Sequence, residues 1–410
     1  MSTLDSLLNY AIQRVPRYKG LRPDLEGFPL SNKRAILADV PANISDELGP
    51  EKDRLVYFLF DETQHSDTKY ESIYNAHIIV EETSGSTGTP FRIPKTIAER
   101  SHLASGIWNN RRKFDPGLRP SQFYPFIHEP LNFVAKGNPY IYSPQNLGAL
   151  YEALSEAGIR WVHGEPQLFH WHARQLSPDI AKRKTVRFAE SSGRHISGEY
   201  REIIETKLNV SLIDQYGCRE AWVIGTRNHD GPFEVLAENV VVELVDASGR
   251  RIEEPDCTGR IVVTCLHQRL FPFIRYDTGD MGRWEGHVGQ TLRLLELREH
   301  NILRLENTEV NGNEFFRIML AMAYSSVGHI NLAYVQVRQK AATEFIFATS
   351  PSPKAQQLCE AVESASKLQS GFPAEARFDL HQLLDDEVAK ELNNKPTLFT
   401  TKFMWSNLSP

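Results

Sequence analysis

The sequence predicts an α/β fold in which a large N-terminal domain, with mixed sheets, helices and an antiparallel β subdomain, precedes a small α+β C-terminal domain. Three observations support this prediction. The chain has 410 residues, more than one hydrophobic core usually contains. Strand-like and helix-like runs alternate along its first part, and the pattern restarts after about residue 298. We therefore expect an N-terminal domain at 1–297 and a C-terminal domain at 298–410.

The N-terminal domain shows both helical and extended patterns. Residues 76–81 and 210–217 are rich in β-branched residues and predict strands, whereas 146–158 and 198–208 have the spacing of amphipathic helices. Alternation of this kind favours a mainly parallel sheet. Residues 237–266 contain two β-branched runs around an SGR turn, so we expect an antiparallel subdomain there.

The last part of the chain repeats the alternation on a smaller scale. An apolar helix is predicted at 314–323, strands at 332–339 and 343–350, a helix at 353–368 and a further strand at 376–383. Roughly 110 residues are enough for a small α+β domain.

The composition of the chain argues against nucleic acid and membranes as partners. With 41% hydrophobic residues, 24% charged residues and a net charge of −6, the chain has neither a basic surplus for nucleic acid nor the low hydrophobicity of disorder. No apolar run approaches the roughly 18 residues of a membrane helix. Residues 1–15 form an amphipathic pattern that includes Asp5, unlike a signal peptide. We expect small-molecule or protein partners, no nucleic acid and no membrane.

Cysteine usage indicates a reducing compartment. The cysteines form no C-x-x-C pair and do not cluster with histidines at metal-ligand spacing, so a cytoplasmic protein is expected. They are Cys218, Cys257, Cys265 and Cys359.

A hydroxyl-rich loop, EETSGSTGTPFR, follows the strand predicted at 76–81. Its glycines allow close approach of the backbone, and its hydroxyl and N–H groups donate hydrogen bonds, which suits an anion such as phosphate. It is neither a Walker loop, since Pro90 stands five residues after Gly85, nor a G-x-G-x-x-G turn. A polar loop without a ligand is the alternative. The candidate phosphate ligands are Thr83, Ser84, Gly85, Ser86, Thr87 and Gly88.

These segments together resemble the ANL superfamily of adenylate-forming enzymes. The loop is similar to its phosphate loop, DQYGCRE (214–220) to its Y-G-x-T-E segment, and FPFIRYDTGDMGRW (271–284) to its R-Y-x-T-G-D segment. VPRYKG, LEGFPLSNKRAI and GRIVVTCLHQRLFPFIRYDTGD are similar to the phenylacetate-CoA ligase branch and its capsule-associated relatives. The chain thus resembles an atypical member of that branch.

The resemblance implies a site for ATP and Mg²⁺. Glu220 would coordinate Mg²⁺, a hard cation that prefers carboxylate and phosphate oxygens. Residues expected to contact adenine or ribose are Ser192, Gly193, Arg194, Tyr216, Gly217, Asp280 and Arg298. A strand-end aromatic for Tyr216 and a turn cap for Asp280 are the structural alternatives. Arg298 matches the family's hinge segment, so the C-terminal domain is expected to be mobile about it, although Leu297 replaces the usual glycine.

The acid substrate is expected beside an aromatic run, FYPFIHEPLNF. Tyr124, Phe126 and His128 suit an aromatic carboxylic acid, although aromatic runs are more often core than pocket.

Two expected catalytic positions depart from the family pattern. Arg219 replaces a threonine or serine; it either supplies a bidentate cation to the adenylate or fills the nucleotide site. Lys402 is the candidate for the family's catalytic lysine, with Lys395 second, but no glycine pair precedes either, and a solvated tail lysine is the alternative.

The leading hypothesis is an acid–thiol ligase of the EC 6.2.1 type. It would activate an aromatic carboxylic acid with ATP to an acyl-AMP and transfer the acyl group to coenzyme A. Two alternatives stay open: an adenylating protein of a natural-product pathway, such as a phenazine antibiotic route, that uses another acceptor; and a binding protein that has lost turnover. A homodimer and a carrier protein also stay open as partners.

Overall fold

The computed structural model describes most of the chain and divides it into two compact units. The described residues are 2–60, 71–73, 78–82, 91–126, 144–164, 166–193, 196, 198–298, 302–305, 308–328, 335–369, 372–384, 387 and 399–401. The N-terminal unit comprises Met1–Glu82, Arg92–Thr278 and Gly282–Leu294, and the C-terminal unit comprises Thr83–Phe91, Gly279–Met281 and Leu295–Pro410.

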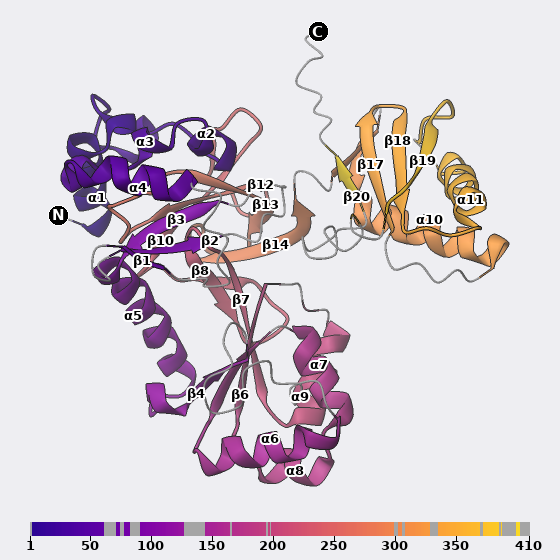
Figure 1. The fold of residues 1–410 in the computed structure, drawn as a ribbon, viewed down its shortest axis with the longest axis horizontal. Helices are drawn as coiled ribbons and strands as arrows, with labels where there is room; N and C mark the ends of the chain where they lie inside the picture. Colours follow the sequence, from indigo (N-terminus) through magenta and orange to yellow (C-terminus); the bar gives the residue numbers. More distant parts are fainter. Residues whose placement is uncertain are drawn as a thin grey trace. The chain divides into compact units, whose positions relative to one another are not determined.

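Short helices build the start of the N-terminal unit (Figure 1). Helix α1 begins where Ser2 and Asp5 form a reciprocal capping box, and it buries Leu7, Leu8 and Ala11, as its amphipathic pattern predicted. The helical elements of this segment are α1 (Thr3–Arg14), η1 (Pro16–Tyr18), η2 (Leu25–Gly27), α2 (Lys33–Leu37), α3 (Val40–Asn43), η3 (Asp46–Leu48) and α4 (Glu51–Phe60).

A large sheet forms the body of this unit. Across the sheet the strands are ordered β11 (Arg251–Ile252), β10 (Val240–Val245), β12 (Thr258–Cys265), β13 (Tyr276–Trp284), β14 (Thr291–Arg298), β9 (Phe233–Val235), β8 (Trp222–Arg227), β7 (Ser211–Cys218), β6 (Phe188–Ser192), β5 (Trp161–Gly164) and β4 (Phe123–Pro125). A smaller antiparallel sheet contains β1 (Glu71–Ile73), β2 (Ile78–Glu82) and β3 (Arg92–Thr96).

Helices cover both faces of strands β4 to β7 (Figure 1). Because successive side chains alternate between faces, Trp161 and Phe188 pack against aromatic residues of α5, whereas Val162, Ala189 and Leu212 join the core beneath α6 to α9. The remaining helical elements of this unit are α5 (Ile97–Phe114), η4 (Pro120–Gln122), α6 (Pro144–Glu156), α7 (Pro166–Gln175), α8 (Pro178–Arg183) and α9 (Gly198–Leu208).

Parallel pairing is less extensive than the sequence predicted. Strands β4 to β7 are parallel, but the pairs β7–β8, β8–β9 and β9–β14 are antiparallel. The prediction of a mainly parallel sheet is therefore wrong, because the hairpins that follow β7 extend the same sheet. The antiparallel subdomain at 237–266 is confirmed, since Val240–Val245 pairs antiparallel with Arg260–Cys265.

The C-terminal unit is an α+β fold. The core of this unit includes Phe316 of α10, Phe345 of β18 and Val362 of α11. Strand β18 pairs antiparallel with β17 and parallel with β19, and β17 pairs parallel with β20. Its elements are β15 (Ile302–Leu305), β16 (Thr308–Asn311), α10 (Gly312–Val327), β17 (Val335–Ala341), β18 (Glu344–Thr349), α11 (Ala355–Lys367), β19 (Arg377–Gln382) and β20 (Phe399–Thr401).

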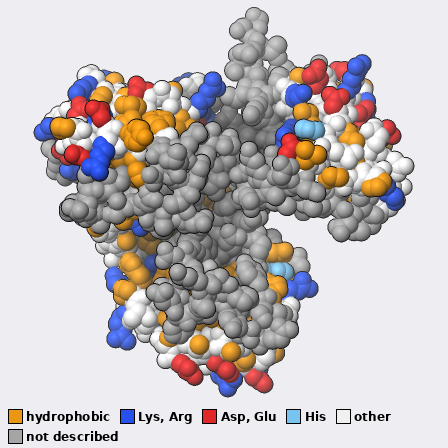
Figure 2. All heavy atoms as spheres, in the orientation of Figure 1, with side chains coloured by type: hydrophobic (Ala, Val, Ile, Leu, Met, Phe, Trp, Pro, Cys, Tyr) orange, Lys and Arg blue, Asp and Glu red, His pale blue; other side chains and the backbone are white. Residues whose placement is uncertain are grey.

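The predicted fold class, α/β with a small α+β domain at the C-terminal end, is confirmed. Mobility of that domain and a hinge at Arg298 stay predictions. No helix in the described part of the chain is both long and apolar enough to span a membrane. On the face drawn in Figure 2, acidic and basic side chains are interspersed over the described surface.

Candidate functional site

A tight hairpin joins β7 to β8 and carries Glu220. The register of the two strands shifts after Tyr216, and the backbones come so close that a Cβ atom on Gly217 would lie 1.8 Å from the carbonyl oxygen of Trp222. Trp222 itself has a φ of 62°, the left-handed region that few non-glycine residues adopt. The segment that contains Glu220 therefore has a constrained backbone for which Gly217 is required.

The Glu220 side chain is buried and is oriented by a neutral donor. Only 6% of the residue is exposed, and the Tyr276 hydroxyl donates to Glu220 Oε1 at 2.7 Å. Burial, reinforced by the negative charge of Glu220, raises the pKa of Tyr276 far above its ordinary value, which keeps the hydroxyl protonated as a donor. Among the described residues, no Lys or Arg forms an ion pair with Glu220, and no group of three or more metal-ligating side chains is present.

Tyr216 is held by the same strand that supplies Tyr276. Its hydroxyl lies 3.3 Å from Thr278 Oγ1, and Thr278 in turn donates to the carbonyl of Ile261 at 3.0 Å, so Tyr216 is the donor to Thr278. Strands β13 and β7 are separated in the sheet by β14, β9 and β8. These contacts therefore show that the sheet curls and brings the two motif segments together.

Asp280 follows Thr278 by two residues on β13, after Gly279 with a φ of 76°. It belongs to the segment Gly279–Met281, which lies in the C-terminal unit. A shared site with Glu220 stays a prediction for Asp280, and a capping role stays its alternative.

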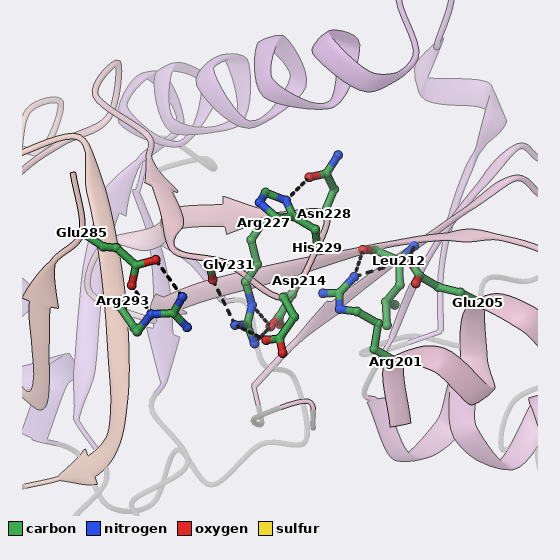
Figure 3. Close-up of polar contacts among 11 residues, drawn as sticks. Arg201, Glu205, Leu212, Asp214, Arg227, Asn228, His229, Gly231, Glu285 and Arg293 are labelled. Atoms are coloured by element: carbon green, nitrogen blue, oxygen red, sulfur yellow. Dashed lines mark hydrogen bonds and ion pairs between the residues drawn. The ribbon is translucent and has the colours of Figure 1, made fainter. Parts of the chain in front are cut away.

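Two buried arginines bind β7 on the side of the hairpin away from Glu220. Asp214 of β7 accepts from Arg227 of β8, whose Nε and Nη2 atoms both lie 2.9 Å from Asp214 Oδ2 (Figure 3). Arg201 of α9 donates to the carbonyl of Leu212 at 2.7 Å in the same view. These contacts fix β7 between β8 and α9.

Ser192 and Gly193 lie at the carboxyl end of β6. The Ser192 hydroxyl is 3.0 Å from Nε2 of His163 on β5, and Gly193 has a φ of 87°. Burial lowers the pKa of His163, although the charge of Glu190 acts in the opposite direction. Ligands of open α/β sheets bind at carboxyl ends of parallel strands, so the position is compatible with the predicted role. Arg194 lies outside the described residues.

The two described residues of the predicted acid pocket lie in an apolar core. Tyr124 is 5% exposed, and its ring centroid is 5.1 Å from that of Phe126. Phe126 also packs edge-on against Phe169 and His172 of α7. A role in substrate binding stays a prediction for both residues.

Several predicted site residues cannot be placed. Outside the described residues lie Thr83, Ser84, Gly85, Ser86, Thr87, Gly88, His128 and Lys402. Arg298 ends β14, and its side chain is likewise outside the described part. Arg219 is half-buried at the β7–β8 hairpin, where its carbonyl accepts a hydrogen bond from Lys95 at 2.8 Å.

The structure adds two residues that the sequence analysis did not single out, Tyr276 and Lys33. Tyr276 is the tyrosine of the R-Y-x-T-G-D segment, which was the signal for it. Ser31 pairs with β13 at Tyr276, and this places Lys33 near the hairpin. Burial lowers the pKa of Lys33, whereas the charge of Glu220 acts in the opposite direction. Lys33 could have been found from the sequence, because it lies in LEGFPLSNKRAI, a segment that resembles the phenylacetate-CoA ligase branch.

Comparison of the fold with solved structures identifies similar proteins. Neither a protein-family model nor a curated protein matches the chain. A structure of 2-hydroxyisobutyryl-CoA ligase in the postadenylation state, in complex with 2-HIB-AMP, has a TM-score of 0.54 and 15% identity over 93% of this chain and 84% of that chain.

Two further structures of that ligase agree. An open conformation in complex with 2-HIB-AMP and CoA has a TM-score of 0.53 and 13% identity over 100% of this chain and 89% of that chain. A complex in the thioesterification state has a TM-score of 0.52 and 17% identity over 96% of this chain and 90% of that chain. At such identities the likeness concerns the fold, so the chain has the fold of 2-hydroxyisobutyryl-CoA ligase.

Proposed function

We propose that this protein is an adenylate-forming ligase, which activates a carboxylic acid with ATP to an acyl-AMP and transfers the acyl group to coenzyme A. One observation supports this most directly. Glu220 of the Y-G-x-x-E segment and Tyr276 of the R-Y-x-T-G-D segment, 56 residues apart in sequence, meet through a hydrogen bond of 2.7 Å. Two segments that resemble one nucleotide site thus converge on a buried carboxylate.

The proposed chemistry requires the chain to bring two anions together. A substrate carboxylate attacks the α-phosphate of ATP, so positive charge and hydrogen-bond donors must offset their repulsion. The buried Glu220 carboxylate fits a cation, since Tyr276 orients it without neutralising it, and Mg²⁺ is usually held by one or two carboxylates together with substrate phosphates. Mg²⁺ bound there would reduce the negative charge of the phosphates.

The other site residues complete the proposal. Thr83 to Gly88 would donate hydrogen bonds to the phosphates, Asp280 and Arg298 would bind the ribose, and Lys402 would meet the carboxylate and the α-phosphate. The residues proposed around adenine are Ser192, Gly193, Arg194, Tyr216 and Gly217.

For the substrate we propose an aromatic carboxylic acid beside Tyr124, Phe126 and His128. Solved structures with this fold carry 2-HIB-AMP, so short hydroxy acids belong in the same screen. Coenzyme A, present in two of those complexes, is the proposed acceptor, and a carrier thiol is the alternative.

ATP–pyrophosphate exchange with a panel of aryl, aliphatic and hydroxy acids tests the proposal. We expect Mg²⁺-dependent exchange with at least one acid, and acyl-CoA by mass spectrometry once coenzyme A is added. The Glu220→Gln variant is the control for adventitious activity. Exchange that is absent for every acid, or equal in the variant, would refute adenylation at this site.

A binding protein without turnover is the second candidate, and Arg219 favours it. A long cationic side chain stands directly before Glu220, where the family has a small hydroxyl residue. If Arg219 obstructs the nucleotide, Arg219→Thr will increase the exchange rate. If it binds the adenylate as an active-site cation, the same change will reduce the rate by about tenfold or more.

A further inference from the structure

Four side chains form a buried polar cluster behind the β7–β8 hairpin. Glu81 of β2, Lys95 of β3, Arg100 of α5 and Trp222 of β8 make it up, and we call it the Glu81 cluster. Glu81 Oε2 accepts from Lys95 Nζ at 2.9 Å and from Trp222 Nε1 at 2.8 Å, while Oε1 accepts from Arg100 at 2.5 Å. One carboxylate thus binds donors from three other elements.

Burial makes these bonds strong. Lys95 is fully buried and Glu81 is 1% exposed. Burial alone raises the pKa of Glu81, but Lys95, Trp222 and Arg100 outweigh this effect and hold the pKa below its ordinary value. The Arg100 guanidinium also lies 5.1 Å from the centre of the Trp222 ring. Glu81 is therefore ionised at neutral pH, and both of its carboxylate oxygens accept hydrogen bonds.

The cluster holds both ends of the segment that carries Glu220. Lys95 Nζ donates to the carbonyl of Arg219 at 2.8 Å, directly before Glu220. The Trp222 indole is bonded to Glu81 two residues after it, and Trp222 has the strained φ of 62°. Backbone strain persists only where surrounding contacts enforce it, and the Glu81 bond supplies such a contact.

We propose that the Glu81 cluster positions the Glu220 carboxylate for its cation, with Lys95 and Trp222 acting as a clamp on residues 219–222. This inference rests on the proposed function for the identity of the cation. Glu81 also lies two residues before Thr83, so the strand that leads into the hydroxyl-rich loop and the hairpin that carries Glu220 are fixed by one carboxylate. Lys95, Trp222 and Glu81 are positioning residues, since they act through the hairpin.

Two variants test the clamp, and one matched variant controls for it. Trp222→Phe removes the indole donor but keeps a ring, and Lys95→Met removes both the bond to the Arg219 carbonyl and the ion pair with Glu81. Trp284→Phe is the control, because Trp284 is 1% exposed and its indole donates to Ile252 at 3.2 Å in the same unit. Lost folding stability alone will thus affect all three variants.

The first measurement needs no ligand. Hydrogen–deuterium exchange of residues 216–224 should be at least about tenfold faster in Trp222→Phe and Lys95→Met, since each loses a bond to the Glu81 carboxylate and Lys95→Met also loses the bond to the Arg219 carbonyl. It should be unchanged in Trp284→Phe. The second measurement is calorimetric titration with ATP at varied MgCl₂ and with EDTA. In the two clamp variants we expect the half-saturating Mg²⁺ concentration to rise about fivefold to tenfold, with ATP binding in EDTA unchanged.

The outcomes separate this inference from the proposed function. If the clamp variants match Trp284→Phe in hydrogen exchange or in Mg²⁺ dependence, the clamp is refuted. If the wild type binds Mg·ATP but catalyses no pyrophosphate exchange, adenylation is refuted and a Mg²⁺ shift in the variants still supports the clamp. If the wild type binds no Mg·ATP, the positioning of a cation ligand is refuted together with the nucleotide site.

Discussion

The parallel half of the large sheet and the tip of the β7–β8 hairpin differ in the partners that they give to a buried carboxylate. In the parallel half, Glu190 of β6 accepts three hydrogen bonds from Arg111 at 2.7 to 3.1 Å. At the hairpin, Glu220 accepts from a tyrosine hydroxyl and forms no direct ion pair with a described residue, although its charge interacts with that of Lys33. Glu190 is paired directly with an arginine, whereas Glu220 has no direct ion pair among the described residues.

A buried charge is stable only where its desolvation is compensated. Removing an ion from water costs several kcal/mol, and a nearby opposite charge offsets that cost. Glu190 has such a partner in Arg111, so it serves the structure. Glu220 accepts from a neutral donor and interacts with the charge of Lys33 without a direct ion pair, so we infer that a bound cation would add to the offset. Lys184 is a buried cation whose described hydrogen-bond partners are also neutral. It donates to the carbonyls of Val186 and Asn209.

The largest stability effect is expected from Glu190→Gln. The change leaves the Arg111 guanidinium buried without its counter-charge, so the free energy of unfolding should fall by about 3 to 5 kcal/mol. Glu220→Gln should change it by less than about 1 kcal/mol, because Glu220 forms no direct ion pair with a described residue and an amide oxygen can still accept from Tyr276. Urea unfolding at pH 7 measures both. Equal losses in the two variants would show that Glu220 is also paired inside the protein.

The largest effect on activity is expected from Glu220→Gln. Without the carboxylate, Mg²⁺-dependent pyrophosphate exchange should fall by about 10²- to 10³-fold, comparable to the loss of one electrostatic contact to the transition state. Asp214→Asn is unsuitable as a control because it unpairs Arg227. Glu285→Gln alters a half-buried pair with Arg293 (Figure 3) and should leave exchange unchanged. Exchange that survives in Glu220→Gln would remove the cation role.

Gly217→Ala should disrupt the hairpin through backbone contact alone. A Cβ atom would lie 1.8 Å from the Trp222 carbonyl oxygen, so the strands must move apart, at a cost of about 1 to 3 kcal/mol. Gly117→Ala serves as a comparison, since neither glycine has a left-handed φ but the atom nearest to a Cβ on Gly117 is 3.6 Å away. Thermal unfolding and exchange activity should both separate the two variants, and a tolerated Gly217→Ala would argue against the tight hairpin.

Tyr276→Phe should have a smaller effect on activity. It removes the donor that orients Glu220 and leaves the charge, so we expect about a tenfold loss in exchange rate and a raised Mg²⁺ requirement. Tyr18→Phe is a matched control, because Tyr18 is 1% exposed and lies in the separate cluster around α1. If both variants behave alike, the Tyr276 hydroxyl has a purely structural role.

The smallest effect is expected from pH and concerns Lys184. Burial lowers the pKa of Lys184 to about 8 from its ordinary 10.5, and Arg187 adds to the shift. Between these values the unfolded chain holds a proton that the folded chain has lost, so stability should rise with pH from about 8 upward. We expect a gain of about 1 kcal/mol by pH 9.5 in the wild type relative to Lys184→Met, measured by urea unfolding. Parallel pH profiles would contradict the lowered pKa.

Much of the fold could be predicted because helix and strand patterns are local. The helix at 198–208, the strand at 210–217 and the antiparallel pairing within 237–266 all follow from spacing over a few residues. The extent of parallel pairing was predicted wrongly, because strand neighbours are chosen by the whole sheet and not by one run.

The candidate site was predictable only as a set of segments. The sequence itself determined which segments carry glycines, hydroxyls and carboxylates, since these are properties of short stretches of chain. Tertiary structure alone decided that Tyr276 orients Glu220 and that Trp222 binds Glu81 across 141 residues of sequence. It also decided which buried carboxylates acquire a cation. The physical reason is that the energy of a buried charge depends on which distant donors the folded chain brings within about 3 Å.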